Sequence, residues 1–233
     1  MECYIDKWEK SYERHENFCL YPHEQYVKFL NRFVRKKTSI DAHKDLLQCP
    51  PGESRPLRGL DYGCGIGRLT LLLKEFDLDA YGIDISSYAI NNAKKLARSL
   101  NFAGMEDKFQ VTDGSKIQFE DNFFDIAISE AVLDSMKFQV AQQIISEIDR
   151  VVRKYFFISL ISGDNSKHFR EYAGEEVVQT DFEEGTIQSY FNMEKINKLI
   201  EGTSFSIKWC HLISEESLTE RWKNSRYYIL LEK

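Results

Sequence analysis

One run of the sequence, Leu57–Leu73 (LRGLDYGCGIGRLTLLL), restricts the possible folds of this chain more than any other. The residues up to Tyr62 predict a short strand, and Gly63, Gly65 and Gly67 follow as a glycine-rich turn. Leucines at helical spacing come next and predict an amphipathic helix. Glycine allows the backbone to approach a ligand closely, and a helix N-terminus presents free N–H groups to an anionic group. The run therefore predicts a nucleotide-binding corner.

The spacing of the glycines disfavours two common nucleotide sites. A dinucleotide-binding turn carries a third small residue at the position that Arg68 occupies here, so an NAD(P)-dependent oxidoreductase is disfavoured. A P-loop is excluded because no Gly-Lys-Ser/Thr sequence follows the glycines. Asp61 lies two residues before the first glycine, and an acid at this position suits a ligand with a cationic end better than a pyrophosphate.

The pattern Asp-x-Gly-x-Gly-x-Gly resembles motif I of the class I S-adenosylmethionine-dependent methyltransferases. This resemblance implies a ligand with an α-amino group, a carboxylate and a sulfonium, and no phosphate. It places Asp61, Gly63, Cys64, Gly65 and Gly67 at S-adenosylmethionine, whose product is S-adenosylhomocysteine. Cys64 is then a small spacer in the turn and not a nucleophile.

Three further stretches follow in the order typical of this family. Residues 81–85 predict a second strand, and an Asp near a strand end about 20 residues after the glycines is placed to hold ribose hydroxyls. We therefore expect Asp84 and the adjacent Ile85 at the cofactor. Ser86 or Ser87 then caps a helix whose apolar residues share one face.

The third and fourth strands complete the resemblance. Residues 109–112 predict a strand that leads into Asp113 and Gly114, where the family places an acid and a backbone amide against the adenine. Residues 125–129 (DIAIS) predict the fourth strand, and we expect Ser129 at its end to contact the cofactor. The resemblance is strong over residues 55–160.

The implied fold is an α/β, Rossmann-like, doubly wound sheet of seven strands with N-terminal helices. The sheet is expected to be mostly parallel with an antiparallel last strand. Residues 1–54 form an N-terminal helical roof over the cofactor, and residues 55–233 form the methyltransferase core, in which the polar segment 161–188 is the substrate lid. The later elements are expected as follows: a helix from 141 to 152, a strand at 155–160, a helix at 192–200, and strands at 205–213 and 227–232 joined by a polar connection.

The N-terminal segment contains two predicted helices. Trp8, Tyr12 and His15 share one face of the first, and the second begins near Pro22. These aromatic residues either pack on the sheet or roof the cofactor, and in the second case Tyr12 contacts it. A basic run, Arg35-Lys36-Lys37, fits a solvated helix end.

Composition excludes several functional classes. The chain of 233 residues has 31 Lys and Arg against 37 Asp and Glu, a net charge of −6, so nucleic acid is not expected as a partner. Its five cysteines are scattered without a Cys-x-x-Cys pair, and no acidic cluster has ligand spacing, so no metal is expected. With neither a membrane-spanning run nor an apolar leader, the expected location is cytoplasmic, without a membrane partner.

Few residues qualify as catalytic groups. Methyl transfer needs a base only where the acceptor must lose a proton. The candidates are His168 in the lid, Glu130 and Asp134 after the fourth strand, and His23 near the roof. Glu130 is equally well explained as a capping or cofactor-side carboxylate.

The acceptor is expected to be a small molecule with an oxygen or nitrogen nucleophile. The family's Asn/Asp-Pro-Pro-Tyr motif for base and glutamine amino groups is absent. One alternative is a protein methyltransferase that acts on arginine or on a chain terminus. The other is a non-catalytic protein that binds S-adenosylmethionine.

Overall fold

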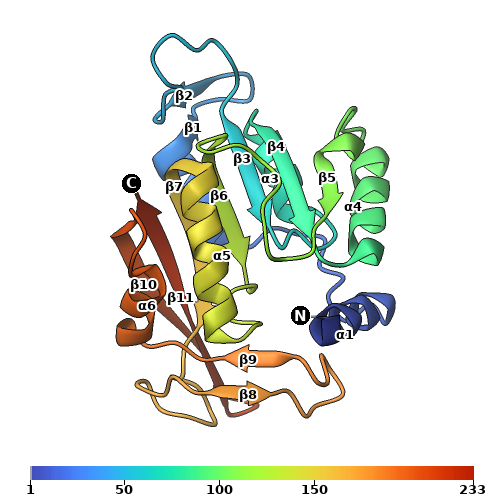
Figure 1. The fold of residues 1–233 in the computed structure, drawn as a ribbon, viewed down its shortest axis with the longest axis vertical. Helices are drawn as coiled ribbons and strands as arrows, with labels where there is room; N and C mark the ends of the chain where they lie inside the picture. The colour runs from blue at the N-terminus through green and yellow to red at the C-terminus, as the bar shows by residue number, and fades with distance from the viewer. Residues whose placement is uncertain (1) are drawn as a thin grey trace.

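A mixed sheet of seven strands forms the centre of the computed structural model, which describes residues 2–233. Its strand order is β10-β11-β7-β6-β3-β4-β5, and only β11 runs antiparallel to its neighbours (Figure 1). This confirms the predicted mostly parallel sheet with an antiparallel last strand. The strands are β3 Arg58–Tyr62, β4 Asp79–Asp84, β5 Phe109–Val111, β6 Phe124–Glu130, β7 Val152–Ile161, β10 Ser206–Ser217 and β11 Trp222–Glu232.

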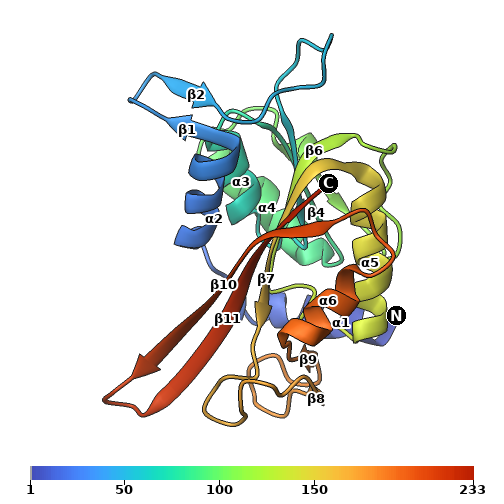
Figure 2. The ribbon, with the colours of Figure 1, turned by 90° about the vertical axis from the view of Figure 1, so that its left-hand side faces the viewer.

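Helices cover both faces of the sheet, as the alternation of strands and helices along the chain requires. In Figure 2 the sheet is seen nearly edge-on, with α2 and α3 on one side and α5 and α6 on the other. The helices are α1 Glu2–Glu13, α2 Glu24–Phe29, η1 Leu30–Val34, α3 Arg68–Glu75, α4 Ser87–Ser99, η2 Glu106–Lys108, α5 Phe138–Val151 and α6 Met193–Ile200.

Two apolar layers hold the helices to the sheet. On one face the Phe29 ring of α2 stacks on Phe157 of β7 with ring centroids 4.6 Å apart. On the other face Ile144 and Ile148 of α5 are fully buried against β6 and β7. The run in β7 is continuously apolar because both of its faces are covered.

Local sequence signals set the helix starts. The Ser86 side chain accepts a hydrogen bond from the Ala89 N–H at 3.0 Å, and Asn192 caps α6 by accepting one from the Lys195 N–H at 2.9 Å. Ser86 is therefore the cap of α4, one of the two residues that the sequence offered. These side chains satisfy N–H groups that have no partner within the first turn of a helix.

Two expectations about the ends of elements were wrong. Most of the segment 214–225, which was expected to be a polar connection between the strands, belongs to the strands themselves, because β10 and β11 stay paired as far as Ser217 and Trp222. Their hairpin projects beyond the body of the molecule (Figure 2), so its residues are exposed and lack the apolar alternation of a packed strand. His15 lies past the end of α1, in a left-handed conformation with φ of 61°.

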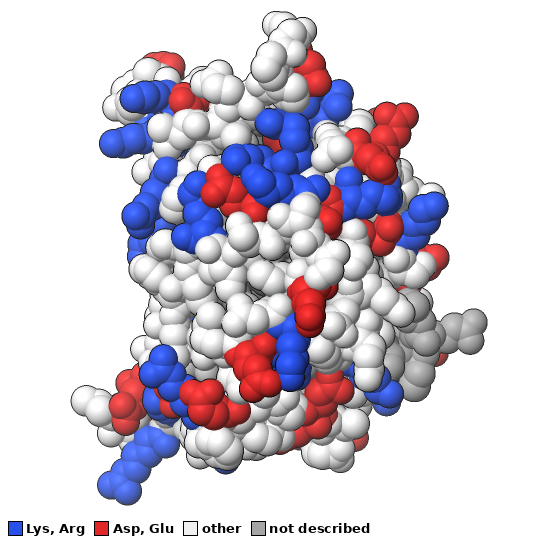
Figure 3. All heavy atoms as spheres, turned by 60° about the vertical axis from the view of Figure 1, so that its left-hand side comes forward, with Lys and Arg blue, Asp and Glu red and all other residues white. Residues whose placement is uncertain are grey.

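The basic run at Arg35 follows the end of a helix, as expected, since Arg35 is the C-cap of η1, and it also begins a strand. Strand β1 (Arg35–Lys37) pairs with β2 (His43–Asp45), and the buried Arg35 guanidinium forms an ion pair with Asp45. The ion pair stabilises a hairpin where only a solvated helix end was expected. On the face shown in Figure 3, basic side chains gather toward this end of the molecule, with acidic ones between them.

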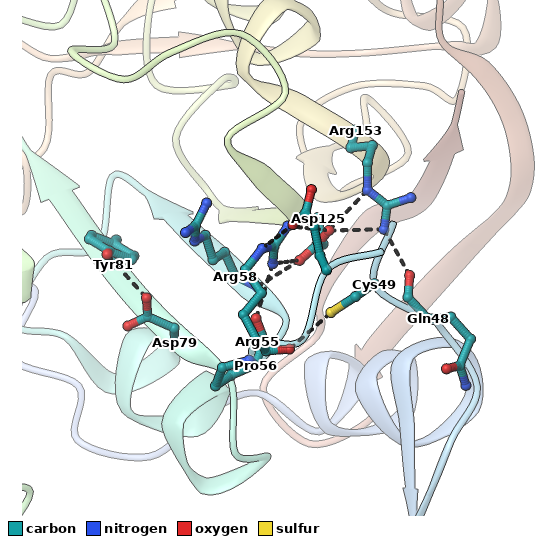
Figure 4. A network of polar contacts seen from close by, with 10 residues as sticks. Gln48, Cys49, Arg55, Pro56, Arg58, Asp79, Tyr81, Asp125 and Arg153 are labelled. Atoms are coloured by element: carbon teal, nitrogen blue, oxygen red, sulfur yellow. Dashed lines mark hydrogen bonds and ion pairs between the residues drawn. The ribbon is translucent and has the colours of Figure 1, made fainter. Parts of the chain in front are cut away.

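A buried acid fixes the segment that leads into β3. Asp125 at the start of β6 accepts hydrogen bonds from the Arg55 guanidinium at 2.6 Å, the Arg58 N–H at 2.8 Å and the Arg153 Nε at 2.9 Å (Figure 4). The neighbouring Arg55 lowers the pKa of the Asp125 carboxyl, although burial alone would raise it. This network lies at the amino ends of the strands, away from the glycine turn.

The expected lid contains regular structure. Strands β8 (Glu175–Val177) and β9 (Ile187–Ser189) form a small antiparallel hairpin within and just beyond the segment 161–188. Figure 1 shows this hairpin and α1 at the end of the sheet to which β4 and β6 point. Within residues 2–233, no helix has the length and apolar character needed to cross a bilayer.

Candidate active site

A cavity of about 480 Å³ lies at the carboxyl ends of the parallel strands. Ligands of open α/β sheets bind at this edge, outside the ends of the strands. Its walls come from α1, the turn after β3, the ends of β4 and β5, the segment after β6 and the start of β11. Ten of the residues predicted for the site line this cavity: Tyr12, Asp61, Gly63, Cys64, Gly65, Asp84, Ile85, Asp113, Gly114 and Glu130.

The glycine turn has a conformation that other residues adopt with difficulty. Gly63 and Gly65 have φ of 72° and 53°, in the left-handed region that disfavours a Cβ atom. A Cβ at Gly63 would lie 2.3 Å from the Val132 side chain, and one at Gly65 would lie 2.6 Å from the Tyr12 hydroxyl oxygen. A side chain at either glycine would therefore clash, at Gly63 with Val132 and at Gly65 with Tyr12.

Asp84 links this turn to the next helix. Its carboxylate accepts hydrogen bonds from the Gly65 N–H at 2.8 Å and the Ser86 N–H at 2.9 Å. Burial raises the pKa of the Asp84 carboxyl to about 6, because removal from water penalises the charged form. Two backbone donors leave acceptor capacity on this carboxylate for a ligand hydroxyl.

Asp61 is a second buried acid at the other side of the turn. The Thr70 hydroxyl donates to its carboxylate at 2.7 Å. Burial raises the pKa of Asp61 to about 7, with a smaller contribution from the negative charge of Glu130. Because burial makes the ionised form of Asp61 unfavourable, a cationic ligand group beside it would stabilise that form.

The far end of the corner is formed after β5. Asp113 lines the cavity and accepts from the Ser115 hydroxyl at 2.7 Å and the Ser115 N–H at 2.8 Å. The Ser115 hydroxyl lowers the pKa of this carboxyl. Gly114 and Ile85, which were predicted to bind the cofactor, also lie in the cavity wall.

Helix α1 covers this corner and is fixed by one side chain. The Glu9 carboxylate accepts hydrogen bonds from the Ser86 and Ser87 hydroxyls and from the Tyr88 N–H, at the start of α4. Trp8 and Tyr12 on the same helix line the cavity. By contrast, α2 packs on the face of the sheet, where the Tyr26 hydroxyl donates to the Ser129 carbonyl at 2.7 Å.

Two predicted cofactor residues support the site without lining it. Gly67 is the N-cap of α3, and a Cβ there would lie 2.8 Å from the Phe109 ring. The Ser129 hydroxyl donates to the Tyr62 carbonyl at 2.9 Å and is buried. Both residues hold the strand ends and the helix start in register.

The candidate catalytic residues are not brought together. Glu130 lines the cavity but forms an ion pair with Arg68 at 2.7 Å. Asp134 is fully buried and accepts from the Arg226 guanidinium at 2.7 Å and the Ile161 N–H at 2.6 Å, so it is a structural acid. Asp134, whose Oδ1 is buried without a hydrogen-bond partner, does not line the cavity, and Glu130 shares the cavity wall with the cation of Arg68, so the geometry supports neither as the base.

The two histidine candidates lie outside the cavity wall. His168 stacks on Tyr172 with ring centroids 4.0 Å apart, and its Nε2 lies 3.0 Å from Glu176. His23 caps α2 and stacks on Tyr228. Geometry therefore gives no support to His168 as the general base.

Several lining residues were not among the predicted ones. They include Trp8, Arg68, Val132, Glu183, Gln188 and Arg226; Trp8 lies on the predicted roof helix and Arg68 directly follows Gly67, whereas the others come from later segments. Arg226 reaches the site because β11 runs antiparallel, so its first residues meet the carboxyl end of β7 at Ile161. No local motif marks a residue such as Arg226, which only the order of the strands brings to the cavity.

The residues present fit S-adenosylmethionine. The turn offers close backbone approach, Asp61 is an acid for an ammonium group, and Asp84 is an acceptor for ribose hydroxyls. Within residues 2–233 no group of three or more His, Cys, Asp and Glu side chains forms a metal-binding cluster.

A family model described as a methyltransferase domain matches residues 54–232, most of the chain. The chain belongs to the methyltransferase domain family. This confirms the family predicted from motif I and the three stretches that follow it.

This methyltransferase is similar to named enzymes over part of its length. It is 32% identical to ajmaline N-methyltransferase of Rauvolfia serpentina over 113 residues, which are 47% of this chain and 37% of the relative. It is 37% identical to phosphoethanolamine N-methyltransferase 3 of Arabidopsis thaliana over 90 residues, which are 36% of this chain and 16% of the relative. The matches span less than half the length of these curated relatives.

The fold is shared with solved methyltransferases. A SAM-dependent methyltransferase from Methanosarcina mazei superposes with a TM-score of 0.62 at 24% identity, over 80% of this chain and 99% of that chain. This likeness agrees with the predicted Rossmann-like architecture.

Proposed function

We propose that this methyltransferase transfers a methyl group from S-adenosylmethionine to a nitrogen or oxygen nucleophile of a small molecule. One observation carries the proposal: the cavity continues from the glycine corner past Val132 to Gln188 and Arg226. Its volume of about 480 Å³ is in the range of small-molecule sites, roughly 300–1,000 Å³. The two relatives described above are named after the small molecules ajmaline and phosphoethanolamine, which supports a small-molecule acceptor.

Three acids of the cavity wall would hold the cofactor. Asp61 pairs with its ammonium group, Asp84 accepts from its ribose hydroxyls, and Asp113 with the Gly114 backbone faces its adenine. When bound, the cofactor supplies an electrophilic methyl group. Tyr12 and Trp8, on the helix that Glu9 fixes, exclude water from this corner.

The remaining walls would position the acceptor. Ala131, Val132, Ser135 and Met136, together with Gln188 and Arg226, face the part of the cavity beyond the glycine turn. Alignment of two reactants can lower a barrier by about 7–11 kcal/mol, so positioning accounts for much of the rate without a dedicated base. Of the predicted roof 1–54 we assign helix α1 as the cover of the cofactor corner, because it supplies Trp8 whereas α2 packs on the face of the sheet. We assign 161–188 as the acceptor-side lid because it supplies Glu183.

Calorimetric titration tests the cofactor assignment. Wild-type protein is expected to bind S-adenosylmethionine and S-adenosylhomocysteine, and Asp84→Ala is expected to lose this binding because both the ribose acceptor and the brace of the Gly65 turn disappear. Asp107→Ala, at an exposed acid of η2, is the matched control and should bind as wild type does.

Release of S-adenosylhomocysteine with panels of small molecules and of peptides then tests the acceptor class. Turnover with peptides alone would favour a protein methyltransferase. A folded wild-type protein that binds neither nucleotide contradicts the proposal as a whole.

A further inference from the structure

One acid on the acceptor side of the cavity has no cationic partner among the described residues. Within the described chain, two ion pairs lie on the acceptor side, Arg68 with Glu130 and Arg226 with Asp134, each at 2.7 Å, and Lys137 in the same wall belongs to neither. Glu183 also lines the cavity and is half-buried, yet none of the ion pairs between described residues includes it. Its carboxylate is therefore an acid of the acceptor side that no ion pair between described residues neutralises.

The backbone holds Glu183 in place against its own conformational preference. Its φ is 57°, in the left-handed region that a side chain disfavours. The Glu183 N–H donates to the Glu16 carboxylate at 3.0 Å, and the Glu183 carbonyl accepts from the Thr186 N–H at 3.0 Å and from its hydroxyl at 2.8 Å. Such strain persists where the surroundings fix it, and it is common at ligand sites.

The groups that face Glu183 do not neutralise it. Its side chain is hydrogen-bonded by Asn17, and the acids Asp134 and Glu16 lie near enough to disfavour its charge, against the opposing effect of Arg226. Burial is the largest cause that raises the pKa of this carboxyl. A half-buried carboxylate in this setting gains stability from a ligand that brings a positive charge.

We propose that Glu183 binds the methyl acceptor directly and selects one whose nucleophile is a basic amine. This inference rests on the proposed small-molecule methyltransferase function. In water such an amine is an ammonium ion, whose positive charge complements the carboxylate. Trp8, in the same cavity, adds an aromatic face of the kind that attracts ammonium groups.

Glu183 also has a chemical task in this scheme. An ammonium nitrogen has no lone pair, so it must lose a proton before it can accept a methyl group. The N–H bond breaks, the proton passes to a Glu183 carboxylate oxygen, and the electron pair stays on nitrogen as the nucleophile. The protonated carboxyl then returns its proton to solvent. A carboxyl whose pKa burial has raised is better suited to this transfer than an exposed one.

Binding of three molecules with similar skeletons tests the selection without turnover. Phenethylamine, phenethyl alcohol and phenylacetate are titrated by calorimetry into the protein saturated with S-adenosylhomocysteine. We expect the amine to bind most tightly, and Glu183→Gln to weaken it by about 10- to 100-fold, the loss expected for one charge-assisted hydrogen bond. Glu183→Asp, which keeps the charge, should recover part of that affinity.

Glu184→Gln is the matched control, because it removes the same charge from the adjacent exposed residue and should bind as wild type does. The proposal is overturned if both Gln variants behave alike, if the amine does not bind, or if phenylacetate binds best, which would indicate that Arg226 selects an anion. Each variant is first shown to bind S-adenosylhomocysteine. Loss of that binding in wild type refutes the proposed function, whereas intact nucleotide binding without amine selection refutes this inference alone.

Discussion

Replacement of Asp61 by Asn is expected to stabilise the unliganded protein at neutral and higher pH. Burial raises the pKa of Asp61 from 3.8 to about 7, so the folded protein keeps a proton that the unfolded chain has already lost. The free energy of unfolding therefore falls as the pH rises between these values. A difference of about three pH units corresponds to roughly 4 kcal/mol.

The Asn variant cannot ionise, and the Thr70 hydroxyl can still donate to its side-chain oxygen. The stability difference between variant and wild type should therefore grow by about 2–4 kcal/mol from about pH 5 to about pH 8. Urea denaturation of both proteins across this range measures it. Asp107→Asn, at an exposed acid, should show no such growth.

The same acid predicts a proton linkage in ligand binding. A cationic group beside Asp61 lowers the pKa of this carboxyl, so binding of S-adenosylmethionine near about pH 6 should release protons. Calorimetry in buffers of different ionisation enthalpy counts them. A stability difference that does not change with pH, or an unchanged proton count in Asp61→Asn, would refute the assignment of a buried, protonated Asp61.

Two further substitutions test the turn and the opposite end of the sheet. Gly63→Ala should destabilise the protein by about 2 kcal/mol or more, because φ is 72° and the new Cβ meets Val132. A double variant with Val132→Ala should recover part of this loss in thermal melts. No recovery would contradict the steric explanation. Asp125→Asn should cost about 3 kcal/mol in urea denaturation, since it removes the charge of the fully buried carboxylate that pairs with Arg55 and Arg153. A loss in Asp125→Asn below that of an exposed acid such as Asp121→Asn would refute the role of the network.

The cofactor corner could be predicted from sequence because its signals are local. Asp61 and the glycines lie within seven residues, and the conformation of each glycine follows from its lack of a side chain. Asp84 was predicted from its distance along a strand–helix–strand unit. In each case the position follows from one turn or one strand–helix–strand unit that is continuous in the sequence.

The acceptor side could not be predicted in this way. Glu183 and Arg226 line the same cavity as Trp8 only because β11 inserts beside β7 and the segment after β7 returns across the same edge. His168 was ranked by its place in the lid, yet the stacking with Tyr172 holds it away from the cavity wall. Sequence spacing contains no information about such long-range contacts.

The position of β11 in the sheet also sets the order in which the site can form as the chain is synthesised. The strands β3, β4, β5 and β6, which carry the cofactor corner, are complete by Glu130 and pair with one another. Strand β10 follows much later, and its only neighbour in the sheet is β11, which is made last. Arg226 can therefore join the cavity wall only after nearly all of this sequence has left the ribosome. The half of the site that would bind the methyl donor can thus fold during translation, while the half that would bind the acceptor must wait for its final strand.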